Sequence, residues 1–420
     1  MRVLVVATTT GYQIRSFGDA ARALGVRLVF ASDRCDQLDD PWWDQAIPVR
    51  FHAEDAAVAS VLRACADAPV DGVIAVGDRP TVLAARIAEA LGFPGHPPDA
   101  AAASRNKLRT RECLEKAGLP TPRFTARALG DAPESMAGLI PYPIVIKPLA
   151  LSGSRGVIRV DGRDGFGAAL ARVRAILGSP DVRGERDAVH ERVLLESFIA
   201  GREYAVEGVL EHGRFRLLAV FDKPDPLDGP FFEETIYVTP SRAAADVQVR
   251  IAGAVADAAR ALGLHHGPVH AECRVAPDGL VYVLEVAARP IGGLCARALR
   301  FTHAGRVASL EELLLRHAMG EAIGAWQREE AASGVMMIPI PRAGIYRGVS
   351  GVERAARVPG IDDVAITAKP DARLVPLPEG RSYLGFIFAR TPVPAATEQA
   401  LRDAHAHLSF AVDPDVAMAR

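Results

Sequence analysis

Two glutamates and an arginine near residue 280 are the side chains of this sequence best suited to phosphate chemistry. Residues 267–290 predict a hairpin of two strands joined by the turn Ala276–Gly279. Side chains along a strand alternate between its two faces. This alternation places Glu272 on one face of the first strand, and Glu285 and Arg289 on one face of the second. These three charged side chains are therefore expected to share a surface of the predicted sheet.

The spacing of the two glutamates predicts a site for a divalent cation. If the turn is symmetric, Glu272 lies opposite Val283 and diagonal to Glu285, with at most about 7 Å between the glutamate Cβ atoms. Two carboxylates this close repel each other unless a cation or a proton lies between them. Oxygen ligands beside a phosphate group suit Mg²⁺, with Mn²⁺ as a substitute. Arg289 could brace an acyl phosphate or a tetrahedral intermediate. The alternative is a solvated sheet face that carries ordinary acidic residues.

Two histidines at the same hairpin offer a different metal. His266 and His270 lie four residues apart and Glu272 follows, a set that would suit zinc if the segment were helical. Gly267-Pro268 argues against a helix, so zinc is the weaker interpretation.

A lysine at the end of another predicted strand precedes a loop of small residues. The apolar strand ends at Lys147, and Ser152, Gly153, Ser154 and Gly156 follow. Small residues allow backbone N–H groups to approach phosphate oxygens closely, and a lysine before such a loop can neutralise a transferring phosphoryl group. The sequence contains no GxxxxGK[ST] motif, so this loop is not a P-loop. A plain hairpin turn is the alternative.

An acidic hinge follows a further apolar strand. The strand leads into Glu196, and Phe198, Ile199 and Glu203 come shortly after it. The backbone of such a hinge could pair with an adenine edge, Ile199 could cover the ring, and Glu203 could accept hydrogen bonds from ribose hydroxyls. The alternative is a solvent-facing strand end with ordinary acidic residues.

The elements that must position these residues begin with an α/β domain. Short apolar strands alternate with helices in the first hundred residues, which predicts a parallel sheet covered on both faces. The expected strands are Val3–Ala7, Arg27–Ala31 and Gly72–Val76, and the expected helices are Tyr12–Leu24 and Thr81–Leu91.

Two loops of this first domain bear on the ligand. The loop Thr8–Gly11 lacks GxGxxG, so nothing indicates a nicotinamide cofactor. Asp78 follows the third strand directly, where it could contact a substrate or act in a turn or as a helix N-cap.

Breaks in composition divide the remaining chain. The Pro- and Gly-rich residues 93–98 predict a boundary, and Ala100–Ala117 predicts one helix that ends at Gly118. Residues 178–186 and 222–230 are expected to be exposed loops. A second change in composition falls at Ser333-Gly334, before a tail rich in predicted strands. We expect four regions: 1–98, 99–190, 191–330 and 331–420.

The composition narrows the class of protein. The chain has 420 residues and a formal net charge of −2, so it lacks the basic field that attracts nucleic acid or an anionic membrane. No stretch approaches the roughly 18 apolar residues of a membrane span, and the N-terminus does not resemble a signal peptide. The five cysteines are odd in number and form no CxxC pair, which predicts a reduced chain in the cytoplasm. Small-molecule chemistry is therefore expected.

Lysine is rare among the basic residues. Only five of the 49 are lysines, whereas the rest are arginines. In this background a lysine suggests a need for a compact ammonium charge. The five are Lys107, Lys116, Lys147, Lys223 and Lys369.

The order of these features resembles the ATP-grasp superfamily. A lysine follows Asn106, a strand lysine precedes a small-residue loop, an acidic hinge comes next, and two strand-borne glutamates are followed by arginine. Residues 1–98 resemble the pre-ATP-grasp domain, 99–190 the small ATP-grasp subdomain and 191–330 the large one. The tail, around 347–349 and 384–387, resembles the C-terminal domain of bacterial L-amino-acid (dipeptide) ligases. Biotin carboxylase and purine-pathway carboxylate ligases are more distantly similar.

The resemblance implies a role for each site residue. Lys107 and Lys147 would bind ATP phosphates beneath a mobile loop, Ser152–Gly156. Glu196, Phe198 and Ile199 would frame adenine, and Glu203 would hold the ribose. Glu272 and Glu285 would bind Mg²⁺. Arg289 would act at the reacting centre, with Lys223 and His270 as further phosphate or acyl-phosphate contacts. Gly292, Gly293 and Asp78 would line the substrate pocket.

One position departs from the family pattern. The family often has Glu-x-Asn-x-Arg where this chain has Glu285, Ala287 and Arg289. The resemblance therefore implies an ATP-dependent ligase that joins a carboxylate to an amine through an acyl phosphate, and it suggests a homodimer. A carboxylase-like or purine-pathway-like ligase and an ATP-binding module without turnover are the alternatives.

Overall fold

The computed structural model describes residues 1–8, 13–33 and 46–414 of the chain. Three expectations fall outside these ranges: the helix start at Tyr12, the loop residues 9–11 and the state of Cys35. The other four cysteines are free thiols.

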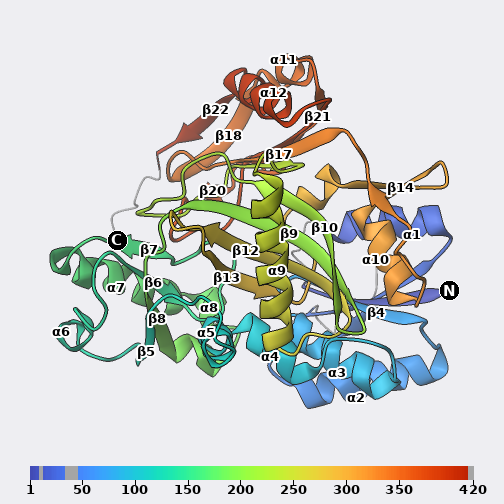
Figure 1. Cartoon of the computed structure of the whole chain (residues 1–420), viewed down its shortest axis with the longest axis horizontal. Helices are drawn as coiled ribbons and strands as arrows, with labels where there is room; N and C mark the ends of the chain where they lie inside the picture. Colours follow the sequence, from blue (N-terminus) through green and yellow to red (C-terminus); the bar gives the residue numbers. More distant parts are fainter. Residues whose placement is uncertain (9–12, 34–45, 415–420) are drawn as a thin grey trace.

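The first domain is a parallel sheet with helices on both faces, as the sequence predicted (Figure 1). Alternate residues of its central strand face opposite ways: Val3 and Val5 belong to one buried cluster, and Leu4 and Val6 to another. In the sheet order β3-β2-β1-β4, the strands are β1 (Arg2–Ala7), β2 (Arg27–Ser32), β3 (Ile47–Pro48) and β4 (Gly72–Val76). The helices are α1 (Ile14–Leu24), α2 (Glu54–Asp67) and α3 (Thr81–Leu91).

The expected single helix over residues 100–117 is two helices, so that prediction was wrong. Helix α4 (Pro98–Arg105) ends and α5 (Lys107–Lys116) begins at Asn106. The Asn106 side chain accepts hydrogen bonds from the backbone N–H groups of Leu108 and Arg109, at 3.0 and 3.3 Å. An asparagine that caps a new helix favours a break over a continuous helix. The break places Lys107 at the first turn of α5.

The second sheet has four antiparallel strands in the order β5-β8-β6-β7. Its strands are β5 (Phe124–Ala128), β6 (Ile144–Pro148), β7 (Ile158–Val160) and β8 (Arg192–Ser197). The accompanying helices are α6 (Pro133–Met136), α7 (Arg163–Leu177), α8 (Pro180–Arg183) and the 3₁₀ helix η1 (Ala188–Glu191). Helix α8 lies within residues 178–186, which were expected to be a loop.

The third sheet has eight strands in the order β13-β12-β9-β10-β11-β17-β21-β19. Its strands are β9 (Arg202–Glu211), β10 (Arg214–Asp222), β11 (Ile236–Thr239), β12 (Gly267–Val275), β13 (Val281–Ala287), β17 (Ala332–Ile338), β19 (Ile361–Ile366) and β21 (Gly385–Thr391). Helices α9 (Ala245–Ala261) and α12 (Pro394–Ala406) pack against it. Strand β17 pairs with β11, so the large sheet continues into the β-rich C-terminal region. The four-region division itself remains a prediction.

Smaller elements complete the chain. A three-stranded sheet contains β14 (Arg300–His303), β15 (Arg306–Ser309) and β16 (Gln327–Arg328), and a second one contains β18 (Gly344–Ser350), β20 (Arg373–Leu374) and β22 (Ser409–Asp413). The remaining helices are η2 (Cys295–Ala298), α10 (Leu310–Ala318) and α11 (Val352–Ala356).

The register of the β12–β13 hairpin differs from the prediction. Glu272 pairs directly with Glu285, whereas Cys273 pairs with Val283. Leu284 is the extra residue of a β-bulge between these two pairs, so the assumed symmetric register was wrong. The bulge brings the two glutamates opposite each other rather than diagonal.

The segment 222–230 is less exposed than expected. Asp222, Lys223 and Leu227 are each buried. The charged Lys223 is tolerated there because carboxylates surround it, as described below.

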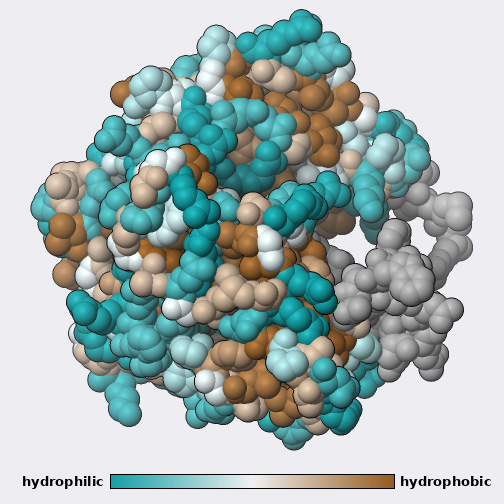
Figure 2. All heavy atoms as spheres, turned by 90° about the vertical axis from the view of Figure 1, so that its right-hand side faces the viewer, coloured by the Kyte–Doolittle hydropathy of each residue, from teal (hydrophilic) through white to brown (hydrophobic). Residues whose placement is uncertain are grey.

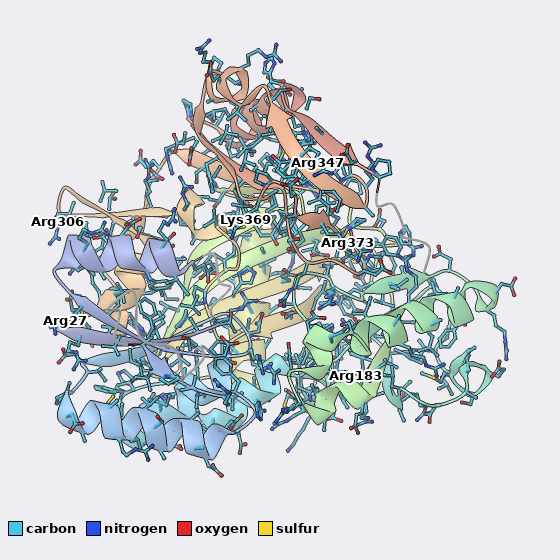
Figure 3. All side chains as sticks on the ribbon, turned by 180° about the vertical axis from the view of Figure 1, so that it is seen from behind. Arg27, Arg183, Arg306, Arg347, Lys369 and Arg373 are labelled. Atoms are coloured by element: carbon cyan, nitrogen blue, oxygen red, sulfur yellow. The ribbon has the colours of Figure 1, made fainter. Side chains whose placement is uncertain are left out.

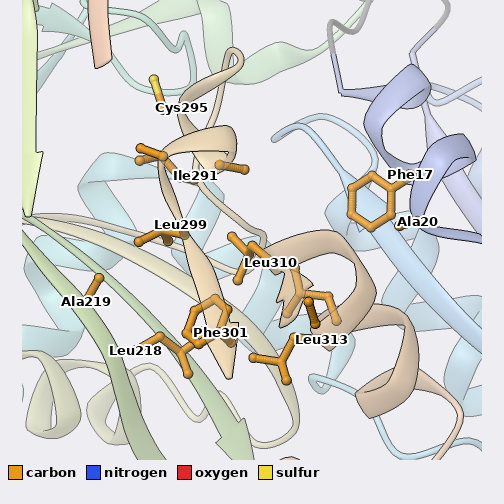
Figure 4. Close-up of a cluster of buried hydrophobic side chains, with 14 of the residues drawn as sticks. Phe17, Ala20, Leu218, Ala219, Ile291, Cys295, Leu299, Phe301, Leu310 and Leu313 are labelled. Carbon is orange, nitrogen blue, oxygen red and sulfur yellow. The ribbon is translucent and has the colours of Figure 1, made fainter. Parts of the chain in front are cut away.

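The parallel sheet, the large sheet and α10 share one apolar core. Phe17 from α1, Leu218 from β10 and Phe301 from β14 belong to the same buried cluster as Leu310 and Leu313 of α10 (Figure 4). Burial of these side chains fixes the first domain against the large sheet. Over the described residues, no helix combines the length and apolar character needed to cross a membrane. The face at the right of Figure 1 mixes hydrophilic residues with smaller hydrophobic patches (Figure 2).

Replacing Gly72 by Ala should loosen the contact between β4 and α10. A Cβ at Gly72 would lie 2.2 Å from the carbonyl oxygen of Ala318, so the two elements would have to move apart. We expect a loss of about 1–3 kcal/mol in the free energy of unfolding, measured by urea titration. Gly18 of α1 is the matched control, because its Cβ would meet nothing within 4 Å. Gly18→Ala should be neutral or stabilising by about 0.5–1 kcal/mol. Equal stability of the two variants would contradict this prediction.

Candidate active site

A cavity of about 460 Å³ is lined by residues of all three main sheets. Most residues singled out from the sequence line it. They are Asp78, Lys107, Lys147, Ser152, Gly153, Ser154, Glu196, Phe198, Ile199, Glu203, His270, Glu272, Glu285, Arg289, Gly292 and Gly293. The structure thus brings together side chains that are up to about two hundred residues apart in the sequence.

Two predicted residues lie behind the lining. Gly156 packs on Pro148, whose Cγ atom would lie 2.8 Å from a Cβ at position 156. Its φ of +74° also favours glycine. Lys223 contacts lining carboxylates without being a lining residue.

A buried cluster of charges forms around Glu196. The fully buried Arg111 donates from Nε to Glu196 Oε2 at 3.0 Å, and Lys147 Nζ pairs with the other carboxylate oxygen. Burial alone would raise the pKa of Glu196, but Arg111 and Lys147 together lower it to about 2. Burial lowers the pKa of Lys147 to about 8, although Glu196 raises it. Glu196 therefore orients two cations by its side chain.

Lys107 bridges the small-residue loop and the hairpin. Its ammonium donates to the carbonyl oxygen of Leu151 at 2.9 Å and lies 3.1 Å from Glu285 Oε2. The backbone N–H of Lys107 also donates to the carbonyl of Leu149 at 2.8 Å. The helix break at Asn106 thus leads directly to a lysine at the edge of the cavity.

Lys223 lies among three glutamates. Its ammonium is 2.8 Å from Glu203, 2.6 Å from Glu234 and 3.3 Å from Glu272. Burial would lower the pKa of Lys223, but these carboxylates raise it well above its ordinary value. Tyr237 donates to Glu234 at 2.5 Å and holds that carboxylate in place.

The carboxylate-rich hairpin fits a divalent cation. Burial and the neighbouring carboxylates of Glu234, Glu203 and Glu285 raise the pKa of Glu272 well above its ordinary value, despite Lys223. The carboxylates around Glu272 carry more negative charge than Lys223 neutralises. Such a set of oxygen donors suits Mg²⁺. Within the described ranges, the carboxylate oxygens of Glu203, Glu234 and Glu272 lie within 4.8 Å of one another. Lys223 occupies the centre of that set, whereas Glu272 and Glu285 are paired with each other across the hairpin.

Arg289 and Asp78 form a bidentate pair across the domains. Arg289 Nε and one terminal nitrogen donate to the two oxygens of Asp78 at 2.7 and 2.9 Å. Although burial opposes the change, Arg289 lowers the pKa of Asp78. Asp78 therefore contacts a site residue rather than acting only in a turn.

The two histidines of the zinc alternative lie in different surroundings. His270 Nδ1 is 3.0 Å from Glu207, which also accepts from the backbone N–H of Ile291. The ring of His266 stacks on His317 at 4.2 Å between centroids. The histidine pair therefore does not form one ligand set in the described structure.

The hinge after β8 presents aromatic and basic side chains. Phe198 stacks on Phe232 at 6.3 Å between centroids, and Arg274 lies 5.0 Å from the centroid of Phe198. Arg274 also donates to Glu203 and to the carbonyl oxygen of Ile199, both at 2.8 Å. Arg274 therefore fixes Ile199 and Glu203, two of the residues that the resemblance assigned to nucleotide contacts.

Several functional residues escaped the sequence reasoning. Arg111 and Glu207 hold site residues through contacts that depend on the fold, and Arg381 and Tyr383 reach the cavity from the C-terminal region. Only Arg274 carried a signal, because the period of two places it on the face of Glu272.

Comparisons with known proteins agree with this geometry. Three family models match: the ATP-grasp N-terminal domain over residues 18–95, the ATP-grasp domain over 140–298 and L-amino acid ligase C-terminal domain 2 over 336–413. The crystal structure of the L-amino acid ligase from Bacillus licheniformis aligns with a TM-score of 0.83 and 27% identity, covering 98% of this chain and 99% of that one.

Two curated relatives match over only part of their own length. Carnosine synthase 1 of Gallus gallus is 32% identical over 66% of this chain and 31% of its own length. The D-alanine–D-alanine ligase of Aromatoleum aromaticum is 30% identical over 46% of this chain and 58% of its own length. The chain thus spans less than two thirds of either relative.

The fold and the site define an ATP-dependent ligase of the ATP-grasp class, and the chain contains the matching ATP-grasp domains. Within it, the C-terminal region is an L-amino acid ligase domain, so the chain groups with the amino-acid and dipeptide ligases. The predictions of the fold and of an ADP-forming carbon–nitrogen ligase are confirmed, and the carboxylase-like and purine-pathway-like alternatives are not favoured.

The lowered pKa of Lys147 predicts a pH-dependent affinity for nucleotide. Lys147 loses its proton near pH 8 instead of near its ordinary value, and only the charged form attracts phosphate. Affinity for Mg·ADP should therefore fall as the pH rises through about 8, by about tenfold per unit above it. Calorimetric titrations at pH 7 and pH 9 measure this change.

Two lysine variants make the test specific. Lys147→Met should bind more weakly and lose the pH dependence, whereas Lys116→Met, on the exposed side of α5, should keep it. A constant affinity in the unchanged protein between pH 7 and pH 9 would contradict the prediction.

Proposed function

We propose that this ligase activates a carboxylate substrate as an acyl phosphate and joins it to an amine, with an amino acid as one substrate. The direct pairing of Glu272 with Glu285, in one cavity with Lys107, Lys147 and Arg289, carries the proposal. Phosphoryl transfer requires positioned groups and neutralised charge more than covalent chemistry from the protein. This cavity offers both.

The nucleotide would lie between the second sheet and the large sheet. Lys107 and Lys147 face its phosphates, and the loop Ser152–Gly156 covers them with backbone N–H groups. The hinge residues Phe198 and Ile199 frame adenine, together with the strand end at Glu196. Glu203 accepts hydrogen bonds from the ribose after exchanging contacts with Arg274 or Lys223.

Glu272 and Glu285 would hold Mg²⁺ or Mn²⁺. When bound, the ion would neutralise phosphate charge, and the carboxylates that raise the pKa of Glu272 support the assignment of a cation to this place. Ala287 offers no ligand atom where the family often has Asn, so water or substrate oxygen would complete the ligand set.

The reacting centre would lie beside Arg289, Lys223 and His270. The substrate carboxylate attacks the γ-phosphorus and gives ADP and an acyl phosphate, and an amine then attacks the acyl carbon while phosphate leaves. Arg289 stabilises the negative charge that develops on the acyl oxygens, and Lys223, held behind the lining by its glutamates, would add positive charge to the phosphoryl site. His270 is oriented by Glu207 for a further contact.

The substrate pocket would combine a polar edge with an apolar end. Gly292 and Gly293 leave room beside Arg289, and Asp78 can accept a hydrogen bond from a substrate amine. Cys295 and Met337 line the same cavity, with their sulfur atoms 3.6 Å apart. An amino acid with an apolar side chain suits this combination. A homodimer and a cytoplasmic location remain proposals of the same kind.

The activity test measures ADP and phosphate release with Mg·ATP and amino acids, singly and in pairs. We expect release that requires a particular pair, with a product lighter by one water than the sum of the two. Bicarbonate-dependent release without an amine would instead favour a carboxylase. Tight ATP binding without any release would favour the non-catalytic module, for which Ala287 is the one motivating feature.

Glu285→Gln tests the metal assignment. We expect ADP release to fall by about a hundredfold or more, because the variant loses a carboxylate of the cation site and the partner of Lys107. The control is Glu115→Gln on the exposed surface of α5, which should keep full activity. Turnover near that of the control in Glu285→Gln would refute the assignment.

A further inference from the structure

A tight turn of the C-terminal region lies against the small-residue loop. The turn, Val375–Arg381, follows β20 and is called here the C-terminal turn. The backbone N–H of Gly380 donates to the carbonyl of Pro376 at 2.9 Å, and a Cβ at Gly380 would lie 1.7 Å from the Val375 oxygen. Only glycine fits there, so the turn has a defined shape. Viewed from behind, Arg373 of β20 lies toward the part of the molecule that carries Arg183 of α8 (Figure 3).

The C-terminal turn holds the loop by backbone and side-chain contacts. The N–H of Gly156 donates to the carbonyl of Pro378, and Arg155 Nε donates to that of Glu379, both at 2.9 Å. The Glu379 carboxylate accepts two hydrogen bonds from Arg172 of α7, each at 2.8 Å. The turn therefore joins the loop that covers the phosphates to the helix behind it.

Arg381 ends this turn at the edge of the cavity. The side chain is exposed and lines the cavity together with Ser152, Gly153 and Ser154. A Cβ at Gly153 would lie 3.7 Å from the Cβ of Arg381, so the arginine and the loop backbone are in direct contact. The base of the Arg381 side chain is therefore next to the loop backbone that would cover the phosphates, and the guanidinium lies within one side-chain length of it.

The ion pairs of the cavity set Arg381 apart. Lys107, Lys147, Arg274 and Arg289 form the pairs described above, and Arg79, Arg105 and Arg155 pair with Asp33, Asp187 and Asp181. Over the residues that the structure describes, Arg381 is the one basic side chain of the lining that lacks a carboxylate within 4.0 Å. A cation without a partner can meet a phosphate without first breaking an ion pair.

We propose that Arg381 contacts the phosphates of the bound nucleotide and that the C-terminal turn places it there. The inference rests on the proposed function, because it assigns a further residue to the same site. Arginine suits this role through its planar set of N–H donors, which match two phosphate oxygens at once. The C-terminal turn must stay docked on the loop Ser152–Gly156 for Arg381 to reach the phosphates. A phosphate bound by Arg381 therefore favours the conformation in which this loop covers the nucleotide.

Nucleotide binding tests the proposal without requiring turnover. Arg381→Gln should bind Mg·ADP and a non-hydrolysable ATP analogue about tenfold or more weakly in calorimetric titrations, since a charged contact to phosphate is lost. Adenosine, which has no phosphate, should bind as before. Arg381→Lys should recover part of the affinity, because an ammonium keeps the charge without the fork geometry. Arg357→Gln is the control, since this exposed arginine of the same region has only a 3.7 Å contact with Glu353.

The outcomes separate this inference from the proposed function. If Arg381→Gln binds both phosphate-containing ligands as tightly as Arg357→Gln, the inference is wrong whatever the activity. An equal loss of adenosine affinity would also overturn it, because the effect would then be a general change in the site. Absence of ADP release from the unchanged protein with every substrate pair would count against the proposed function alone.

Discussion

The buried guanidinium of Arg111 is the interaction on which the geometry of this site depends. It donates to Glu196 on β8 and to the carbonyl oxygens of Val283 and Leu284 on β13, at 3.2 and 2.9 Å. One fully buried cation on α5 thus joins the second sheet to the large sheet. A buried charge is tolerated only when its hydrogen-bonding capacity is met, so both sheets must supply their acceptors in this arrangement. The carbonyls that it binds belong to the β-bulge that brings Glu285 opposite Glu272.

The charged side chains of the cavity are also held in place by one another. Without nucleotide, most cationic side chains of the lining are held by carboxylates, and the carboxylates are held in turn. Such a network keeps each group oriented and limits the cost of burial. Incoming phosphates and a divalent ion would then replace some of these protein partners. The site is therefore positioned before its ligands arrive.

The sequence allowed the fold class to be predicted, and most of the site residues that it singled out line the cavity, because those features follow local rules. The alternation of strands and helices, the period of two on β12 and the small residues after Lys147 are visible over a few residues. Apart from the helix break at Asn106, whose cap is a local contact, the failures arise from tertiary contacts. The bulge at Leu284 depends on Arg111, more than 170 residues earlier, and the helix break at Asn106 was hidden by a continuous helical pattern around it. The roles of Glu234 and Arg381 depend on Lys223 and on the docked C-terminal turn, which no local spacing reveals.

The scarcity of lysine has a practical consequence for covalent labelling. Lys107, Lys147 and Lys223 are buried, with their ammonium groups engaged by carboxylates. The other two lysines, Lys116 on α5 and Lys369 between β19 and β20, are exposed. Amine-reactive dyes or resins would therefore couple at these two side chains and at the N-terminal amine. Replacing either lysine by arginine would restrict side-chain coupling to the other one and leave the cavity lysines out of the reaction.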